Sequence, residues 1–289
     1  MTGYKYNNES PFGEGPQIIR GVAQILQENQ VPCMLIGSYM WAQFVEGEGY
    51  SIDLVIPDAH IYKAIYLLEK AGFPGSDKFL SYDKCLELDP CQVNFGRDFV
   101  PFHQFHLKTT HNSCYHLTLY KQSDSFWTLP KIPLESPAND DPNFMVITDP
   151  RLSFFDWNGI WQPSKNPNYR DDPEFKAAMP PVIIPTFPRS CEALMRLAAR
   201  DFHLDCRRET LLDAARIIAV KVYDVTMAVC PDLNKLERFH EVFRPLWEVL
   251  KKCGHNREAR MEELARLIVK LEEAGEMPET PTMHLASRE

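Results

Sequence analysis

Residues 31–56 read VPCMLIGSYMWAQFVEGEGYSIDLVI, and the fold prediction rests mainly on this segment. Its first six residues form a short, mostly apolar run that ends at Gly37 and Ser38, which predicts a buried strand followed by a tight turn. Its last six residues alternate between polar and apolar side chains and stop before a proline. Because side chains alternate between the two faces of a strand, this segment predicts a strand with Ser51 and Asp53 on one face.

Helices are predicted on both sides of these strands. Residues 17–30 place apolar side chains at helical spacing, and residues 39–46 predict a short helix between the strands. After the second strand, Asp58 is a candidate N-cap for a helix over residues 59–71, which Gly72 would close.

Two more amphipathic strands are expected at residues 104–110 and 114–122, as antiparallel neighbours. Four histidines lie on or near them: His103, His106, His111 and His116. Cys114 lies close by, which would suit a metal site, but on paired strands only His106 and His116 would face the same side. We therefore expect no metal site here, and we interpret these histidines as polar residues of the strands. Among them, His106 or His116 could serve acid–base chemistry, or could contact a phosphate together with the neighbouring Lys108.

The chain is expected to fall into four parts and to belong to the α+β class. Residues 1–128 form an α/β domain with a mixed sheet and helices. Residues 129–188 contain twelve prolines, which predicts a packed, irregular segment without regular helix or central strand. Residues 189–275 are helical in periodicity, with roughly four helices, and residues 276–289 form a flexible tail. Two residues are expected to interrupt these helices: Pro231 and Gly254.

Composition excludes several classes of protein. Hydrophobic residues make up 44 % and charged residues 25 %, which is ordinary for a globular protein. No stretch approaches about 18 consecutive apolar residues and the first residues lack a signal peptide's apolar core, so we expect a cytoplasmic protein without a membrane partner. Eight cysteines without a CxxC pair indicate packing thiols in a reduced compartment. The net charge of −9 is not that of a DNA-binding protein.

A strand, then Gly37 and Ser38, a helix, and a strand carrying Asp53 resemble the opening of the nucleotidyltransferase fold, over about residues 17–72. In that family the small residue pair lets backbone amides approach a phosphate, and paired carboxylates hold divalent cations. The resemblance implies an acidic residue where this chain has Ser51. It also implies a third acid on a later strand, where His106 and Lys108 stand. One carboxylate cannot form a two-metal clamp, so the resemblance favours chemistry without paired metals.

The size, the proline-rich middle and the helical second half also resemble the fungal arginine-containing cyclodipeptide synthases. Members of that group join arginine to a second amino acid, taken from aminoacyl-tRNAs, and no cofactor or metal is expected. The resemblance implies recognition of a guanidinium or amino group by Asp53 with Glu46 or Glu48. It also implies an oxyanion held by Ser38 and the Gly37 backbone, with protons moved by His106. Ser51 and Lys108 are further substrate-binding candidates.

Three arginines could contact the acceptor stem of the tRNA. Arg189, Arg196 and Arg200 are spaced by seven and four residues and so share one face of a predicted helix. Their guanidinium groups could equally pair with the chain's own carboxylates. The candidate partners are Asp201, Asp205, Glu209 and Asp213.

Two alternatives to a synthase remain open. The first is an enzyme of the nucleotidyltransferase fold that acts on a nucleotide and a small acceptor, for which metal-dependent nucleotide binding is expected. The second is a catalytically dead module of that fold, which would bind a ligand without consuming it.

Overall fold

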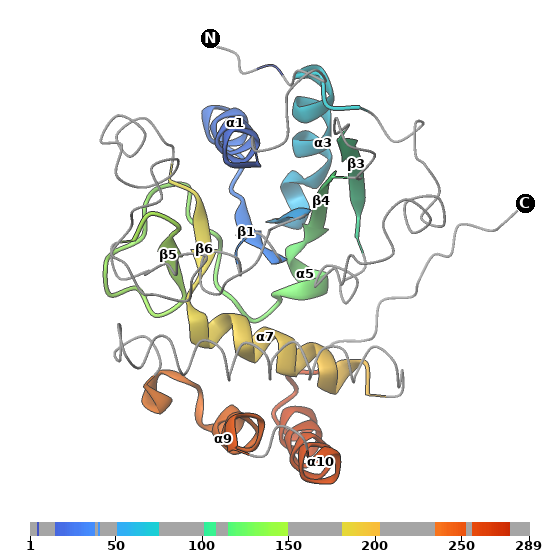
Figure 1. Cartoon of the computed structure of the whole chain (residues 1–289), viewed down its shortest axis with the longest axis vertical. Coiled ribbons are helices and arrows are strands. Elements are labelled where there is room, and N and C mark those ends of the chain that lie inside the picture. Colours follow the sequence, from blue (N-terminus) through green and yellow to red (C-terminus); the bar gives the residue numbers. More distant parts are fainter. Residues whose placement is uncertain are drawn as a thin grey trace, which may run out of the picture. The chain divides into compact units, whose positions relative to one another are not determined.

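The computed structural model describes residues 15–37, 51–74, 101–107, 115–149, 181–202, 235–252 and 256–277, together with Lys5 and Met40 (Figure 1). The chain divides into two compact units. The first comprises the described residues up to 123 together with 129–149 and 181–185, and the second comprises 124–128 and those from 186 onward.

A six-stranded mixed sheet forms the first unit, in the order β3-β4-β2-β1-β6-β5. The strands are β1 (Met34–Ile36), β2 (Ser51–Ile56), β3 (His103–Leu107), β4 (Tyr115–Lys121), β5 (Phe144–Val146) and β6 (Ile183–Pro185). β2 pairs antiparallel with β1 and parallel with β4, while β3 and β4 pair antiparallel. The expected mixed sheet is confirmed, as is the antiparallel pairing of the two strands that follow residue 100.

One face of this sheet is apolar and carries helices. The side chains that form its centre are at most 3 % exposed: Ile52, Leu54, Ile56, Phe105, Leu117 and Leu119. Helices α1 (Gly15–Glu28) and α3 (Ile61–Lys70) pack against each other. Phe73, just after α3, meets Phe105 edge-on with ring centroids 5.9 Å apart, which places α3 on the apolar face (Figure 1). Burying each large apolar side chain contributes about 1.5–3 kcal/mol.

Asp58 does not cap the helix that follows it, so that prediction is wrong. The residue begins a 3-10 turn, η1 (Asp58–His60), and α3 starts only at Ile61. Its carboxylate instead accepts hydrogen bonds from Ser123, at 3.1 Å from the backbone nitrogen and 2.6 Å from the hydroxyl. The extra turn separates the carboxylate from the amide groups of the α-helix. Gly72 does follow the helix in the left-handed conformation, at φ 97°, as a closing glycine should.

The expectation that residues 129–188 contain no central strand is also wrong. β6 lies inside the sheet, parallel to β1 on one side and antiparallel to β5 on the other. It fits between prolines because it is only three residues long and its single proline, Pro185, is the last of them. β1 is shorter than the predicted 31–36, and the helix predicted at 39–46 lies outside the described residues except for Met40.

The second unit is helical. Its described elements are α7 (Phe187–Arg200), the 3-10 turns η5 (Leu236–Arg238) and η6 (Glu241–Phe243), α9 (Arg244–Lys252) and α10 (Arg257–Glu273). The short helix α5 (Gln122–Ser125) spans the boundary between the units. α10 packs against α7 and α9, and the Asn256 side chain caps it by accepting a hydrogen bond from the Ala259 backbone nitrogen at 3.1 Å. The breaks predicted at Pro231 and Gly254 lie outside the described residues. No helix in the described ranges is both long and apolar enough to span a membrane.

Trp247 lies at the centre of the helical core. Its ring stacks on Phe239 at 4.7 Å and meets Phe187 edge-on at 5.7 Å, and it is 1 % exposed. We expect Trp247→Ala to lower the free energy of unfolding by about 3–5 kcal/mol, because it opens a cavity that these rings cannot fill. Denaturant unfolding followed by circular dichroism measures the loss. Val269→Ala, at a 52 % exposed position of α10, is the control and should change stability by less than about 0.5 kcal/mol. Equal effects of the two substitutions would contradict this packing.

Candidate functional site

The candidate site is built around a contact between Gly37 and Asp53. Gly37 follows the last residue of β1, and Asp53 is the register partner of Ile36 on the antiparallel strand β2. Gly37 has a φ of 75°, and a Cβ atom placed there would lie only 2.1 Å from Oδ2 of Asp53. A side chain at residue 37 would therefore collide with the carboxylate as well as strain the backbone. Glycine allows the carboxylate to lie directly against the backbone at the end of β1.

The Asp53 carboxylate is buried, with the residue only 1 % exposed. The hydroxyl of Tyr120 donates a long hydrogen bond of 3.4 Å to Oδ1. Removing a carboxylate from water is costly unless it is paired or hydrogen-bonded, and buried titratable groups are concentrated at functional sites. Asp53 is therefore the main candidate for the ligand-binding or reactive group of this site.

Polar residues continue from Asp53 across the neighbouring strands. Thr118 on β4 is the register partner of Asp53, and Gln104 on β3 is the register partner of Thr118. Gln104 Nε2 donates to Thr118 Oγ1 at 3.4 Å. Register partners share one face of a sheet, so these three residues form a polar row. They lie opposite the apolar face that carries α3.

A second row of positions runs beside the first. Ser51 is the register partner of His116, and His116 is that of His106, as expected for the one histidine pair that would face the same side. His103 belongs to the apolar face, where burial lowers the pKa of its imidazole and the charge of Glu69 partly opposes that shift. The two rows place Asp53 and Ser51 on β2 and His106 on β3, all three proposed from the sequence as site residues, with β4 between the two strands.

Among the residues that the structure describes, the polar row of this site contains one carboxylate, that of Asp53. Its neighbours in the polar row offer a hydroxyl and an amide, and β2 carries Ser51 where the nucleotidyltransferase resemblance implies an acid. Within the described residues, no group of three or more His, Cys, Asp or Glu side chains is placed to hold a metal ion. This arrangement suits the binding of a cationic group better than the binding of two divalent metals.

Four of the predicted site residues lie outside the described residues: Ser38, Glu46, Glu48 and Lys108. Sequence reasoning did not identify Thr118 and Tyr120 as neighbours of Asp53, or Gln104 as the next member of the polar row. Alternation along residues 114–122 signalled that Thr118 and Tyr120 share a face, but nothing in the sequence indicated that this strand would pair in parallel with β2.

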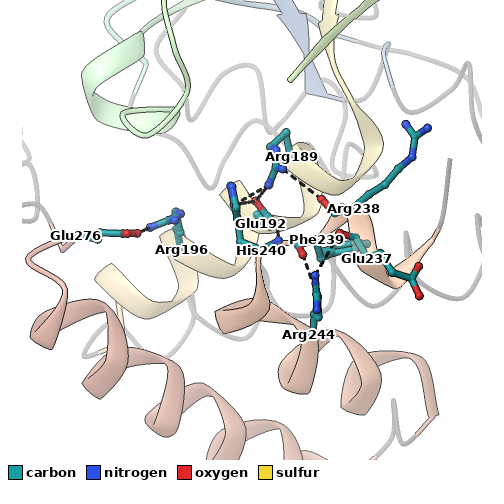
Figure 2. Close-up of polar contacts among 9 residues, drawn as sticks. All are labelled: Arg189, Glu192, Arg196, Glu237, Arg238, Phe239, His240, Arg244 and Glu276. Atoms are coloured by element: carbon teal, nitrogen blue, oxygen red, sulfur yellow. Dashed lines mark hydrogen bonds and ion pairs between the residues drawn. The ribbon is translucent and has the colours of Figure 1, made fainter. Parts of the chain in front are cut away.

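Arg189 is buried in a network of the second unit (Figure 2). Its guanidinium pairs with Glu192, lies 2.6 Å from His240 Nδ1 and donates to the Arg238 carbonyl at 3.2 Å. Glu192 Oε1 also accepts the His240 backbone N–H at 2.6 Å, and its Oε2 lies 2.9 Å from His240 Nδ1. These contacts hold the segment around His240 against α7.

Arg196 and Arg200 also have partners within the second unit. Arg196 pairs with Glu276 at 2.5 Å (Figure 2), and its guanidinium lies 4.6 Å from the centre of the Phe243 ring. Arg200 pairs with Asp201 at 2.8 Å and donates to the Asp124 carbonyl at 2.7 Å. The three arginines thus pair with carboxylates of the chain itself, which was one of the two roles considered from the sequence. Asp201, the partner of Arg200, is one of the acids that the sequence suggested as partners.

Two cysteines are free thiols in the described part, Cys33 and Cys191. Burial raises the pKa of Cys33 to about 12. Burial, followed by the charge of Glu192, raises the pKa of Cys191 well above its usual value. Burial therefore favours the neutral thiol form of both side chains at neutral pH.

Comparison with known proteins gives no relative from which a function could be carried over. No protein-family model, no curated protein and no solved structure matches the chain.

The contact between Gly37 and Asp53 can be measured with a double-mutant cycle. We expect Gly37→Ala to lower the free energy of unfolding by more than about 2 kcal/mol, because the new methyl group meets the carboxylate and φ is positive. In an Asp53→Ala background the same substitution should cost less, since Oδ2 and Cγ are gone. Gly275→Ala is a matched control, because Gly275 has φ 67° but nothing within 4 Å of its added Cβ. An equal cost of Gly37→Ala in both backgrounds would contradict the contact.

The network at Glu192 should be needed for stability. Glu192→Ala leaves Arg189 buried without its carboxylate, so we expect a loss of about 3–5 kcal/mol in the free energy of unfolding. Glu262→Ala is the control, since Glu262 pairs with Arg266 on the exposed surface of α10 and should contribute at most about 1 kcal/mol. Thermal or denaturant unfolding compares the two variants, and a loss at Glu192 no larger than the control would overturn the assignment.

Proposed function

We propose that this protein is an aminoacyl-tRNA-dependent transferase that forms arginine-containing cyclodipeptides. The observation that carries the proposal is the buried Asp53 carboxylate against Gly37, in a polar row without a second carboxylate. The resemblance of the chain to arginine-containing cyclodipeptide synthases supports the same reaction.

A single carboxylate suits aminoacyl transfer. In this reaction the α-amine of one aminoacyl group attacks the ester carbonyl of another, an amide bond forms, and the ester C–O bond to the tRNA breaks. The proton lost by the amine goes to the released ribose hydroxyl. A second attack of the same kind closes the six-membered ring and releases the second tRNA. Each step needs positioning, a proton carrier and oxyanion stabilisation, but no metal pair.

The proposed roles follow from this chemistry. Asp53 holds a cationic group of the substrate, either the attacking amine or the arginine guanidinium, by a charge-assisted hydrogen bond. The Gly37 backbone and Ser38 stabilise the oxyanion, and His106 carries the proton. Other residues contribute to substrate binding in this proposal: Glu46, Glu48, Ser51 and Lys108.

A second candidate is a nucleotidyltransferase that acts on a nucleotide and a small acceptor. The approach of the Gly37 backbone to the Asp53 carboxylate favours it, because a glycine turn beside an acid is how that fold places a phosphate near a cation. It requires further acidic ligands in addition to Asp53. A catalytically dead module of the same fold is the third candidate.

The proposal is tested by expressing the full chain in a heterologous host and analysing the medium by mass spectrometry. We expect a new cyclic dipeptide ion whose mass shifts when isotopically labelled arginine is fed. Asp53→Asn should abolish the product, because it removes the charge and keeps the volume. Asp58→Asn is the control, since Asp58 is an exposed carboxylate in the same unit, outside the polar row, and should leave the product unchanged.

The opposite results separate the alternatives. Full product formation by Asp53→Asn would remove Asp53 from the chemistry. If no product forms, thermal shift measurements with ATP or CTP and magnesium follow. Stabilisation of the wild type that needs both nucleotide and metal would replace the synthase with the nucleotidyltransferase.

A further inference from the structure

Two tyrosines on α3 are exposed to an unusual degree. Tyr62 is 74 % exposed and Tyr66 is 57 % exposed, and they lie one helical turn apart. Apart from Val269 on α10, they are the large apolar side chains left exposed in the described part of the chain. Neither phenol hydroxyl makes a hydrogen bond to the described residues. The two rings thus present aromatic surface to solvent.

The tyrosines stand on a rigid support. The opposite side of α3 is anchored by three fully buried residues, Ile61, Ala64 and Leu68. Tyr62 is braced by Phe102, which meets it edge-on with ring centroids 5.4 Å apart. Rings held in this way lose little conformational entropy when a flat partner stacks on them.

Three lysines lie on or next to this aromatic surface. Lys70 lies over the Tyr66 ring at 5.4 Å, and Lys121 lies over the Phe102 ring at 4.3 Å. Lys63, which follows Tyr62 in the helix, is exposed and donates to the Asn29 carbonyl at 2.7 Å. α3 also carries one exposed acidic residue, Glu69. We define the tyrosine face as the three aromatic residues and the three lysines: Tyr62, Lys63, Tyr66, Lys70, Phe102 and Lys121.

The composition of the tyrosine face favours a nucleic acid over a protein partner. Protein–protein interfaces are enriched in tyrosine but depleted in lysine. Surfaces that bind single strands combine exposed aromatic rings, on which bases stack, with lysines that meet the phosphates. A chain with a net charge of −9 would repel phosphates elsewhere, so a local group of lysines beside aromatic rings is informative.

We propose that the tyrosine face binds single-stranded RNA by base stacking on Tyr62 and Tyr66. The choice of RNA rests on the proposed function, whose substrates are tRNAs; because α3 lies on the opposite face of the sheet from Asp53, this surface would hold unpaired nucleotides other than the aminoacyl end. Lys70 and Lys121 supply the phosphate contacts. The arginines of α7 belong to the second unit, where their guanidinium groups pair with carboxylates.

Fluorescence anisotropy with a labelled single-stranded RNA of about twelve nucleotides tests this surface on the full chain. We expect binding by the wild type and an increase in Kd of at least about tenfold in Tyr62→Ala/Tyr66→Ala, since two stacking contacts are lost. Tyr62→Phe/Tyr66→Phe keeps both rings and should retain binding. Lys70→Gln/Lys121→Gln should weaken the dependence of Kd on salt. Val269→Ala is the control for loss of an exposed apolar side chain.

Three results of the binding measurements would overturn the proposal. They are no binding by the wild type at low salt, equal binding by the alanine double variant, and equal affinity for a duplex RNA of the same sequence. Self-association that depends on the tyrosines, without RNA binding, would assign the face to a protein contact instead. Normal RNA binding without any cyclodipeptide would refute the proposed function alone. Wild-type product yield from the alanine double variant would refute the RNA surface alone.

Discussion

The carboxylate of Asp53 lies against the backbone of Gly37, and the site depends on this approach. It needs a positive φ at residue 37, which glycine adopts without strain, and an antiparallel register that sets Ile36 beside Asp53. A one-residue slip of that register would move Asp53 to the apolar face. The burial of Ile52 and Leu54 on the other side of the same strand resists such a slip, so the packing of the core also holds the carboxylate in place.

The two faces of β2 have different roles in the first unit. The apolar face seals the core beneath α3 and leaves the outer side of that helix free to present Tyr62 and Tyr66. The other face gathers Asp53 and Thr118 into a row of polar positions. In the account proposed above, the polar row carries the chemistry and the outer side of α3 holds the RNA that delivers the substrate.

The sequence predicts those parts of the fold that follow from local patterns. Alternation located β2 and β4, helical spacing located α1 and α7, and Gly72 marked the end of α3. Long-range pairing was not predictable: nothing local signals that Thr118 lies beside Asp53, or that Arg196 meets Glu276, 80 residues away. β6 was missed because a three-residue strand between prolines gives almost no periodic signal.

The central claim is that Asp53 receives a cationic group of an arginyl substrate. Calorimetric titration with arginine methyl ester, which resembles the arginyl end of a charged tRNA, tests it most directly. Citrulline methyl ester is the matched ligand, since it keeps the shape and lacks the guanidinium charge. The account predicts that the wild type binds the arginine ester and that Asp53→Asn does not. Weaker binding of the citrulline ester by the wild type would assign Asp53 to the guanidinium, and equal binding of both esters would assign it to the α-amine that both carry. Unchanged binding of the arginine ester by Asp53→Asn would contradict the account.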